Sequence, residues 1–61
     1  MGMTLEERIN KIPGENGWWK SNSKESYYHL AKLLTHKGFT ESVAVDILNA
    51  AYWSAVDEFG A

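Results

Sequence analysis

The sequence contains no cysteine, one proline and two histidines among its 61 residues. Without cysteine it can form neither a disulfide nor a thiolate zinc site, which are the usual devices that stabilise very small domains. A chain this short buries only about 60% of its unfolded surface, so its core must supply most of the stability. The composition suits that task, because 44% of the residues are hydrophobic and 13% are aromatic. We therefore expect a single helical domain over residues 1–61.

The sequence also lacks a strong charge of one sign and a long apolar run. A formal net charge of −2 creates no overall field that would attract nucleic acid or an anionic membrane. No apolar run approaches the roughly 18–20 residues that a membrane span requires. Glu6 and Glu7 stand where a signal peptide would carry positive charge. We expect a soluble, cytoplasmic protein that does not enter a membrane.

Residues that could support catalysis or hold a metal ion are scarce. His29 and His36 are seven residues apart, which is roughly 10.5 Å along a helix and too far to share one metal ion. Glu25 and His29 could supply two ligands, but two ligands on a solvated helix form a weak site. No nucleophile stands in a recognisable arrangement with a base. We expect no catalytic residue, no metal, no cofactor and no small-molecule substrate.

The first predicted helix covers residues 5–12. Thr4 and Glu7 have the spacing of a capping box, in which each side chain bonds to the backbone amide of the other residue. Pro13-Gly14 ends the helix. One helical face carries the apolar residues Leu5, Ile9 and Ile12.

The second predicted helix covers residues 24–37 and begins after Asn22 or Ser23, both good capping residues. Gly38 can adopt the left-handed conformation that ends a helix. Glu25, His29, Lys32 and His36 lie on the polar face. The predicted apolar stripe consists of Tyr27, Leu30, Ala31 and Leu34.

The third predicted helix covers residues 41–59 and is capped by Thr40. Its apolar arc covers about half the circumference, more than one contact needs, so we expect it to pack on both other helices or on another copy. The short connection over residues 37–40 makes the last two helices antiparallel. The fold class is therefore all-α, a small three-helix bundle with a tryptophan-containing loop over residues 13–23. The arc consists of Ala44, Val45, Ile47, Leu48, Ala51, Tyr52, Ala55, Val56 and Phe59.

The three tryptophans are the most unusual feature. Trp18-Trp19-Lys20, followed by Lys24, combines aromatic rings with positive charge, a combination that binds single-stranded nucleic acid. The alternative is that one loop tryptophan fills the core while the other stays available. Trp53 lies on the polar arc of the third helix, so it either lies under the loop or marks a contact surface.

Two family resemblances accompany these patterns. The stretch from Asn16 to Trp53 resembles the small helical modules that follow the catalytic domain in phage and plasmid primases, which implies an accessory module of a mobile-element replication protein. Lys20 and Lys24 are the nearest substitutes for the arginines of that family's lead-in segment. The turn over residues 37–40 resembles the first turn of ubiquitin-associated domains, although those domains have a second break where this chain continues helically. The primase resemblance rests on Leu30-Ala31, Leu34, Gly38-Phe39-Thr40-Glu41, Ala44, Ile47 and Leu48.

Two functions follow from this reading. The first is a non-enzymatic helical binding module whose partner is a protein or, more weakly, single-stranded nucleic acid. The second is a small homo-oligomeric structural protein that associates through the apolar face of helix 41–59. The solvent exposure of the three tryptophans separates them, because three buried rings would remove most of the binding surface. The candidate binding residues are Trp18, Trp19, Lys20, Lys24 and Trp53.

Overall fold

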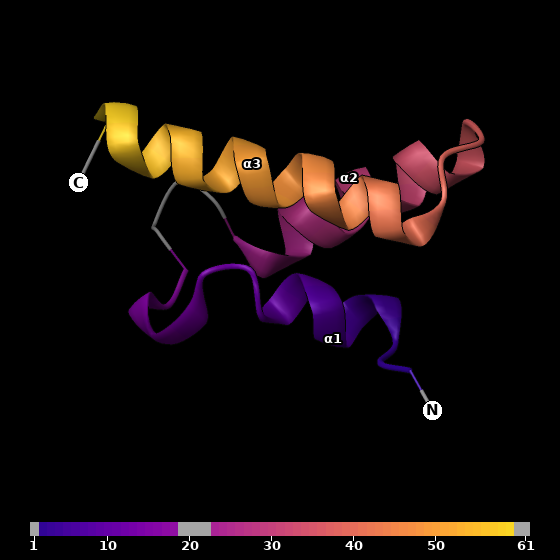
Figure 1. The fold of residues 1–61 in the computed structure, drawn as a ribbon, viewed down its shortest axis with the longest axis horizontal. Helices are drawn as coiled ribbons and strands as arrows, with labels where there is room; N and C mark the ends of the chain where they lie inside the picture. The colour runs from indigo at the N-terminus through magenta and orange to yellow at the C-terminus, as the bar shows by residue number, and fades with distance from the viewer. Residues whose placement is uncertain (1, 19–22, 60–61) are drawn as a thin grey trace.

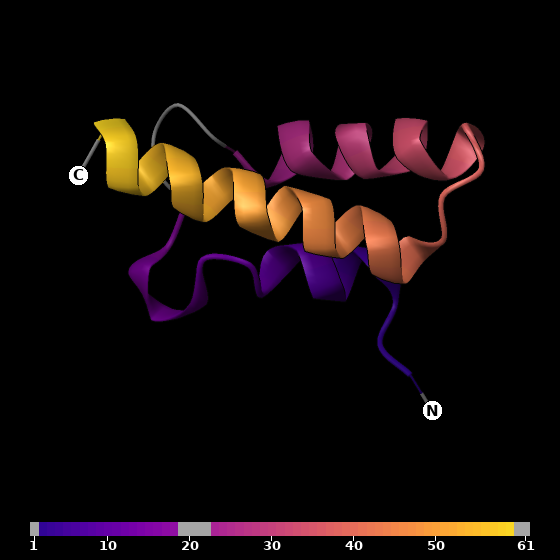
Figure 2. The same cartoon turned by 45° about the horizontal axis from the view of Figure 1, so that its top comes forward.

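The computed structural model describes residues 2–18 and 23–59. These ranges form three α-helices, α1 (Leu5–Asn10), α2 (Lys24–His36) and α3 (Glu41–Phe59), and a short 3₁₀ helix, η1 (Gly14–Asn16). They contain no strand. The antiparallel α2 and α3 form a hairpin, and α1 lies along one side of it (Figures 1 and 2). The fold is the predicted all-α three-helix bundle. No described helix combines the length and hydropathy that crossing a membrane requires.

The capping box at the start of α1 is present. The Glu7 amide donates to Thr4 Oγ1 at 3.1 Å, and the Thr4 amide donates to Glu7 Oε1 at 2.9 Å. The helix ends at Asn10, so the predicted end at residue 12 is wrong. Pro13 explains the difference, because it lacks an amide for the Ile9 carbonyl and disfavours helical geometry at the preceding residue. Ile12 is nevertheless buried, as predicted.

The turn between α2 and α3 follows the predicted glycine cap. Gly38 has φ 113°, and the amides of Gly38 and Phe39 donate to the carbonyls of Thr35 and Leu34 at 3.1 and 3.2 Å. This is the hydrogen-bond pattern of a Schellman motif. It ends α2 at His36, one residue before the predicted end. Thr40 Oγ1 then accepts from the Val43 amide at 3.2 Å and caps α3.

Of the two residues predicted to cap the start of α2, the structure describes Ser23. The Ser23 hydroxyl accepts from the Ser26 amide at 3.2 Å, so Ser23 is the N-cap. Asn22, the other candidate, lies outside the described residues.

The core uses only part of the predicted apolar surface. The prediction that α3 contacts both other helices is confirmed. Leu30 of the predicted apolar stripe of α2 is exposed, and so are Ile47, Ala51 and Phe59 of the predicted apolar arc of α3. The reason is that α1 has only six residues and covers one side of the hairpin. The central cluster consists of Leu5, Ile9, Ile12, Tyr27, Ala31, Leu48 and Tyr52.

Candidate interaction surface

An aromatic cluster joins the loop after α1 to the hairpin. Tyr52 lies at its centre, with ring centroids 5.4 Å from Trp18, 6.0 Å from Tyr27 and 5.2 Å from Trp53. Trp18 and Tyr27 are 5.4 Å apart, and all four pairs meet edge to face. Aromatic pairs prefer this geometry, which contributes about 0.5–1.5 kcal/mol per pair beyond area burial. Burial raises the pKa of the Tyr27 phenol, and the nearby Tyr52 hydroxyl adds to the shift.

Trp18 is half-buried and packs against the core. Its ring packs against Tyr27 and Tyr52, and its Nε1 atom is buried without an acceptor among the described residues. Trp18 thus meets in part the prediction that one loop tryptophan fills the core, because its ring packs on the core cluster but is only half-buried. Such a ring is not free to stack on a nucleic-acid base. The other loop candidates, Trp19 and Lys20, lie outside the described residues.

The sequence left open whether Trp53 lies under the loop or at a contact surface, and the structure shows features of both. Its Nε1 donates to the Ile12 carbonyl at 3.1 Å, while Tyr52 Oη donates to the Gly17 carbonyl at 2.9 Å. These two bonds tie α3 to the segment after α1. Trp53 still exposes 38% of its surface. It therefore holds the loop and leaves part of its ring at the surface.

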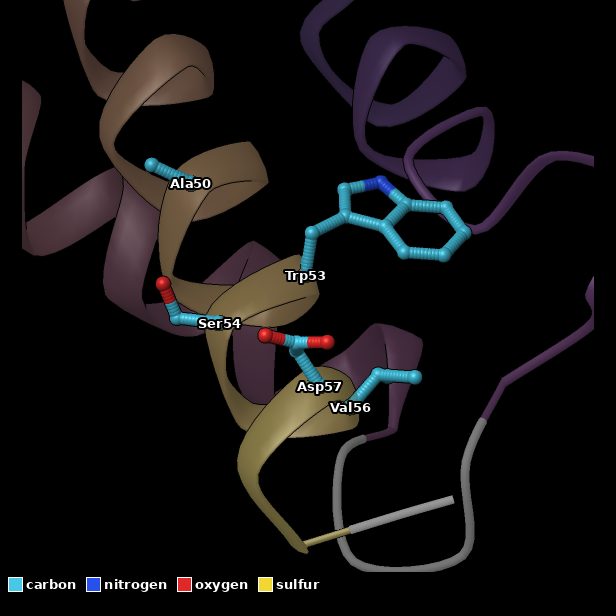
Figure 3. Close-up of a pocket in the computed structure, with 5 residues that line it drawn as sticks. All are labelled: Ala50, Trp53, Ser54, Val56 and Asp57. Carbon is cyan, nitrogen blue, oxygen red and sulfur yellow. The ribbon is translucent and has the colours of Figure 1, made fainter.

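The exposed part of Trp53 borders an open depression on α3 (Figure 3). In Figure 3 the indole reaches from α3 toward the segment after α1, while Ala50 and Ser54 point away from the ring. Asp57 supplies the only charged group among the lining residues. A shallow surface with one carboxylate offers little to orient a small ligand. The lining residues are Ala50, Trp53, Ser54, Val56 and Asp57.

Lys24, the remaining predicted site residue, is half-buried at the first position of α2. Within the described residues it makes neither a hydrogen bond nor a cation–π contact with Trp18 or Trp53. The structure thus places both Trp18 and Trp53 against Tyr52. In the described ranges no three histidine or acidic side chains gather as a metal site would require.

A larger apolar surface lies elsewhere on the hairpin. Arg8 Nη1 donates to Ser42 Oγ at 3.3 Å, so Ser42 marks the side of α3 that faces α1. Ile47 is five residues further along, about 140° around the helix from Ser42, and therefore faces away from α1. In α2 the same five-residue step separates Tyr28, which packs on the core, from the exposed Leu33. We define the outer hairpin face as Leu30, Leu33, Val43, Ile47 and Ala51.

Helices α2 and α3 differ in their charged residues. Four acidic residues and no lysine or arginine occur in α3, namely Glu41, Asp46, Asp57 and Glu58. The basic residues Lys24 and Lys32 lie in α2, with Lys37 at its C-cap, against one acidic residue, Glu25. Lys32 Nζ lies 5.7 Å from the centroid of the Tyr28 ring, which packs on the core, so this lysine is not at the edge of the outer hairpin face.

Comparison with known proteins leaves the function open. No family model, curated protein or solved structure matches the chain. The resemblances to primase modules and to ubiquitin-associated domains therefore stay predictions.

Proposed function

We propose that this chain is a non-enzymatic helical interaction module whose outer hairpin face binds an apolar surface of a protein. The observation behind the proposal is the joint exposure of Leu30, Leu33, Val43 and Ile47, each of which leaves 41–45% of its surface open to solvent. Single exposed apolar side chains are ordinary on protein surfaces. Several on one face, from two adjacent helices, are typical of a contact surface.

The spacing of these residues favours a helical partner. Leu30 and Leu33 are three residues apart on α2, and Val43, Ile47 and Ala51 are four residues apart on α3. These spacings form two apolar ridges along the helices, with a groove between them. An amphipathic helix presents a matching ridge with anchors at the same spacings. The small Ala51 side chain would allow close approach at one end of the face.

The described residues support a protein partner better than a nucleic acid. Trp18, which would stack on a base, packs against the core. Trp53 uses its only polar atom on the Ile12 carbonyl. The acidic α3 would repel phosphates, which dominate the affinity of nucleic-acid complexes.

Site-specific photo-crosslinking tests this function. A benzophenone amino acid is introduced at Ile47, on the outer hairpin face, or at Phe59, which is 72% exposed at the end of α3 but outside that face. After irradiation in cells that make the protein, we expect a crosslink to a protein from position 47 and little from position 59. Equal crosslinking from both positions, none from position 47, or crosslinking to nucleic acid alone would contradict the proposal.

A further inference from the structure

We infer that the depression beside Trp53 binds an arginine side chain of a partner protein. It is lined by other residues than those of the outer hairpin face, so the inference goes beyond the proposed function and does not depend on it. The depression combines the exposed part of the Trp53 indole with the carboxylate of Asp57 (Figure 3). A protein holds its own side chain in place, so a shallow site that would orient a free small molecule poorly is sufficient for it.

The indole of Trp53 is a fixed surface. Its Nε1 donates to the Ile12 carbonyl at 3.1 Å, and the ring meets Tyr52 edge to face with centroids 5.2 Å apart. These two contacts hold the ring, while 38% of the residue remains exposed. Among aromatic side chains, indole attracts cations most strongly, and a planar guanidinium can stack on it. A ring that is already held loses little conformational freedom when a cation binds.

Asp57 lies next to this ring. It follows Trp53 by four residues on α3, a spacing that places the two Cβ atoms about 5–6 Å apart on one side of the helix. A guanidinium can contact both groups, because its flat face lies on the indole while the N–H groups at its edge donate to the carboxylate. A lysine ammonium is a compact, strongly hydrated charge without such a face. The pair therefore favours arginine over lysine.

The end of α3 adds to the attraction for a cation. Its last residues include Asp57 and Glu58, and its last turn contains no basic residue. The helix dipole is negative at this end, so acidic side chains here destabilise the helix and a cation stabilises it. Within residues 2–18 and 23–59, the lysine that lies over an aromatic ring is Lys32, over Tyr28 and not over Trp53. An arginine from a second molecule would balance the negative charge at this end of α3.

Nuclear magnetic resonance titration with N-acetyl-arginine methylamide tests the inference. We expect shifts at the Trp53 indole and at Val56, with a dissociation constant in the millimolar range because the probe lacks the rest of a partner. The lysine analogue should bind at least about threefold more weakly, and the uncharged citrulline analogue should not bind. Asp57→Asn should weaken arginine binding about threefold or more, the size expected for one exposed ion pair. Asp46→Asn, the same change at an exposed position of α3 outside the depression, is the matched control.

Several results would overturn the inference. Equal binding of the arginine and lysine probes, or equal weakening by Asp57→Asn and Asp46→Asn, would indicate general attraction to an acidic helix. An absence of shifts at Trp53 would place no arginine at the ring.

Thermal unfolding distinguishes a role in binding from a role in the fold. Asp57→Asn should leave the melting temperature unchanged or raise it, because a carboxylate near the C-terminal end of a helix opposes the dipole. A lower melting temperature would mean that Asp57 supports the fold, and would overturn the inference. Crosslinking from position 47 tests the proposed function separately from all of these measurements.

Discussion

At the scale of single residues, Tyr52 and Trp53 hold the irregular segment after α1. The backbone from Ile12 to Gly17 is not part of an α-helix, so its carbonyls need donors from elsewhere. Tyr52 Oη and Trp53 Nε1 supply them at Gly17 and Ile12. Consecutive helical residues point about 100° apart, and for this reason the two neighbours reach carbonyls at different points of the segment.

We expect Trp53→Phe to lower the free energy of unfolding by about 1 kcal/mol, the usual net contribution of one hydrogen bond. Phenylalanine keeps an aromatic ring beside Tyr52 but has no donor for the Ile12 carbonyl. Urea denaturation followed by circular dichroism measures the change. Phe59→Leu, on a side chain that is 72% exposed, is the control and should change the free energy little. An unfolding curve for Trp53→Phe that overlays the wild type would show that the bond is not formed in solution.

The cap of α1 adds a pH dependence. Hydrogen bonds from Thr4 hold the pKa of Glu7 below its ordinary value of 4.5. A carboxylate with a lowered folded-state pKa stabilises the fold above the unfolded value, and this contribution disappears as the pH falls through the folded value. Glu7→Gln keeps an acceptor but has no charge. The stability difference between wild type and Glu7→Gln should therefore shrink between about pH 7 and about pH 3. Urea titrations at both pH values test this, and a constant difference would contradict it.

At the scale of elements, two residues that end helices, Pro13 and Gly38, determine how long α1 is and how α2 meets α3. Pro13 ends α1 early, and at six residues that helix depends on the burial of Leu5 and Ile9, because isolated helices so short are unstable in water. The Gly38 turn returns the chain within four residues and makes α3 the antiparallel neighbour of α2. The short α1 leaves the outer hairpin face open.

Gly38→Ala should destabilise the protein by about 1 kcal/mol or more, because alanine disfavours a positive φ. A Cβ at Gly38 would meet no atom within 4 Å, so the effect comes from the backbone conformation alone. Thermal unfolding measures the change. Gly2→Ala also meets no atom within 4 Å and has no positive φ, so it should leave the melting temperature unchanged. A stabilised Gly38→Ala would mean that the turn differs in solution.

At the scale of the whole molecule, the bundle has too few helices to cover the apolar surface of its hairpin. Neighbouring residues of α3 show the consequence, since Leu48 is 4% exposed in the core and Ile47 is 42% exposed on the outer hairpin face. A fourth helix, or a second copy, would be needed to cover Ile47. The stability of the monomer and the proposed association thus depend on different sides of the same helix.

We expect Leu48→Ala to cost about 2–5 kcal/mol, because truncation leaves a cavity in the core. The total free energy of unfolding of a domain of this size is only about 3–5 kcal/mol, so the variant should be largely unfolded. Ile47→Ala, one residue away, is the control and should leave the melting temperature close to that of the wild type, because Ile47 is 42% exposed. Thermal unfolding followed by circular dichroism measures both variants. An unchanged melting temperature for Leu48→Ala would contradict the core assignment.

The sequence by itself determined the features that depend on near neighbours in the chain. The capping box of Thr4 and Glu7, the glycine cap at Gly38 and the bounds of α3 were all predictable, because caps and helical periodicity involve residues within a few positions of one another. The three-helix architecture followed from these elements and their short connection. The end of α1 was missed by two residues, because the apolar pattern continued to Ile12 past the point where Pro13 stops the helix.

Only the tertiary structure decided which apolar residues are covered. Periodicity placed Leu30 and Ile47 on apolar arcs and Trp53 on a polar one, but a helical wheel does not say which side a neighbouring helix will occupy. The contacts that decide it are long-range, such as the bond from Trp53 to the Ile12 carbonyl, 41 residues away. The candidate surface changed for the same reason. Trp18 packs against Tyr27 and Tyr52. The outer hairpin face is exposed because α1 lies on the other side of the hairpin.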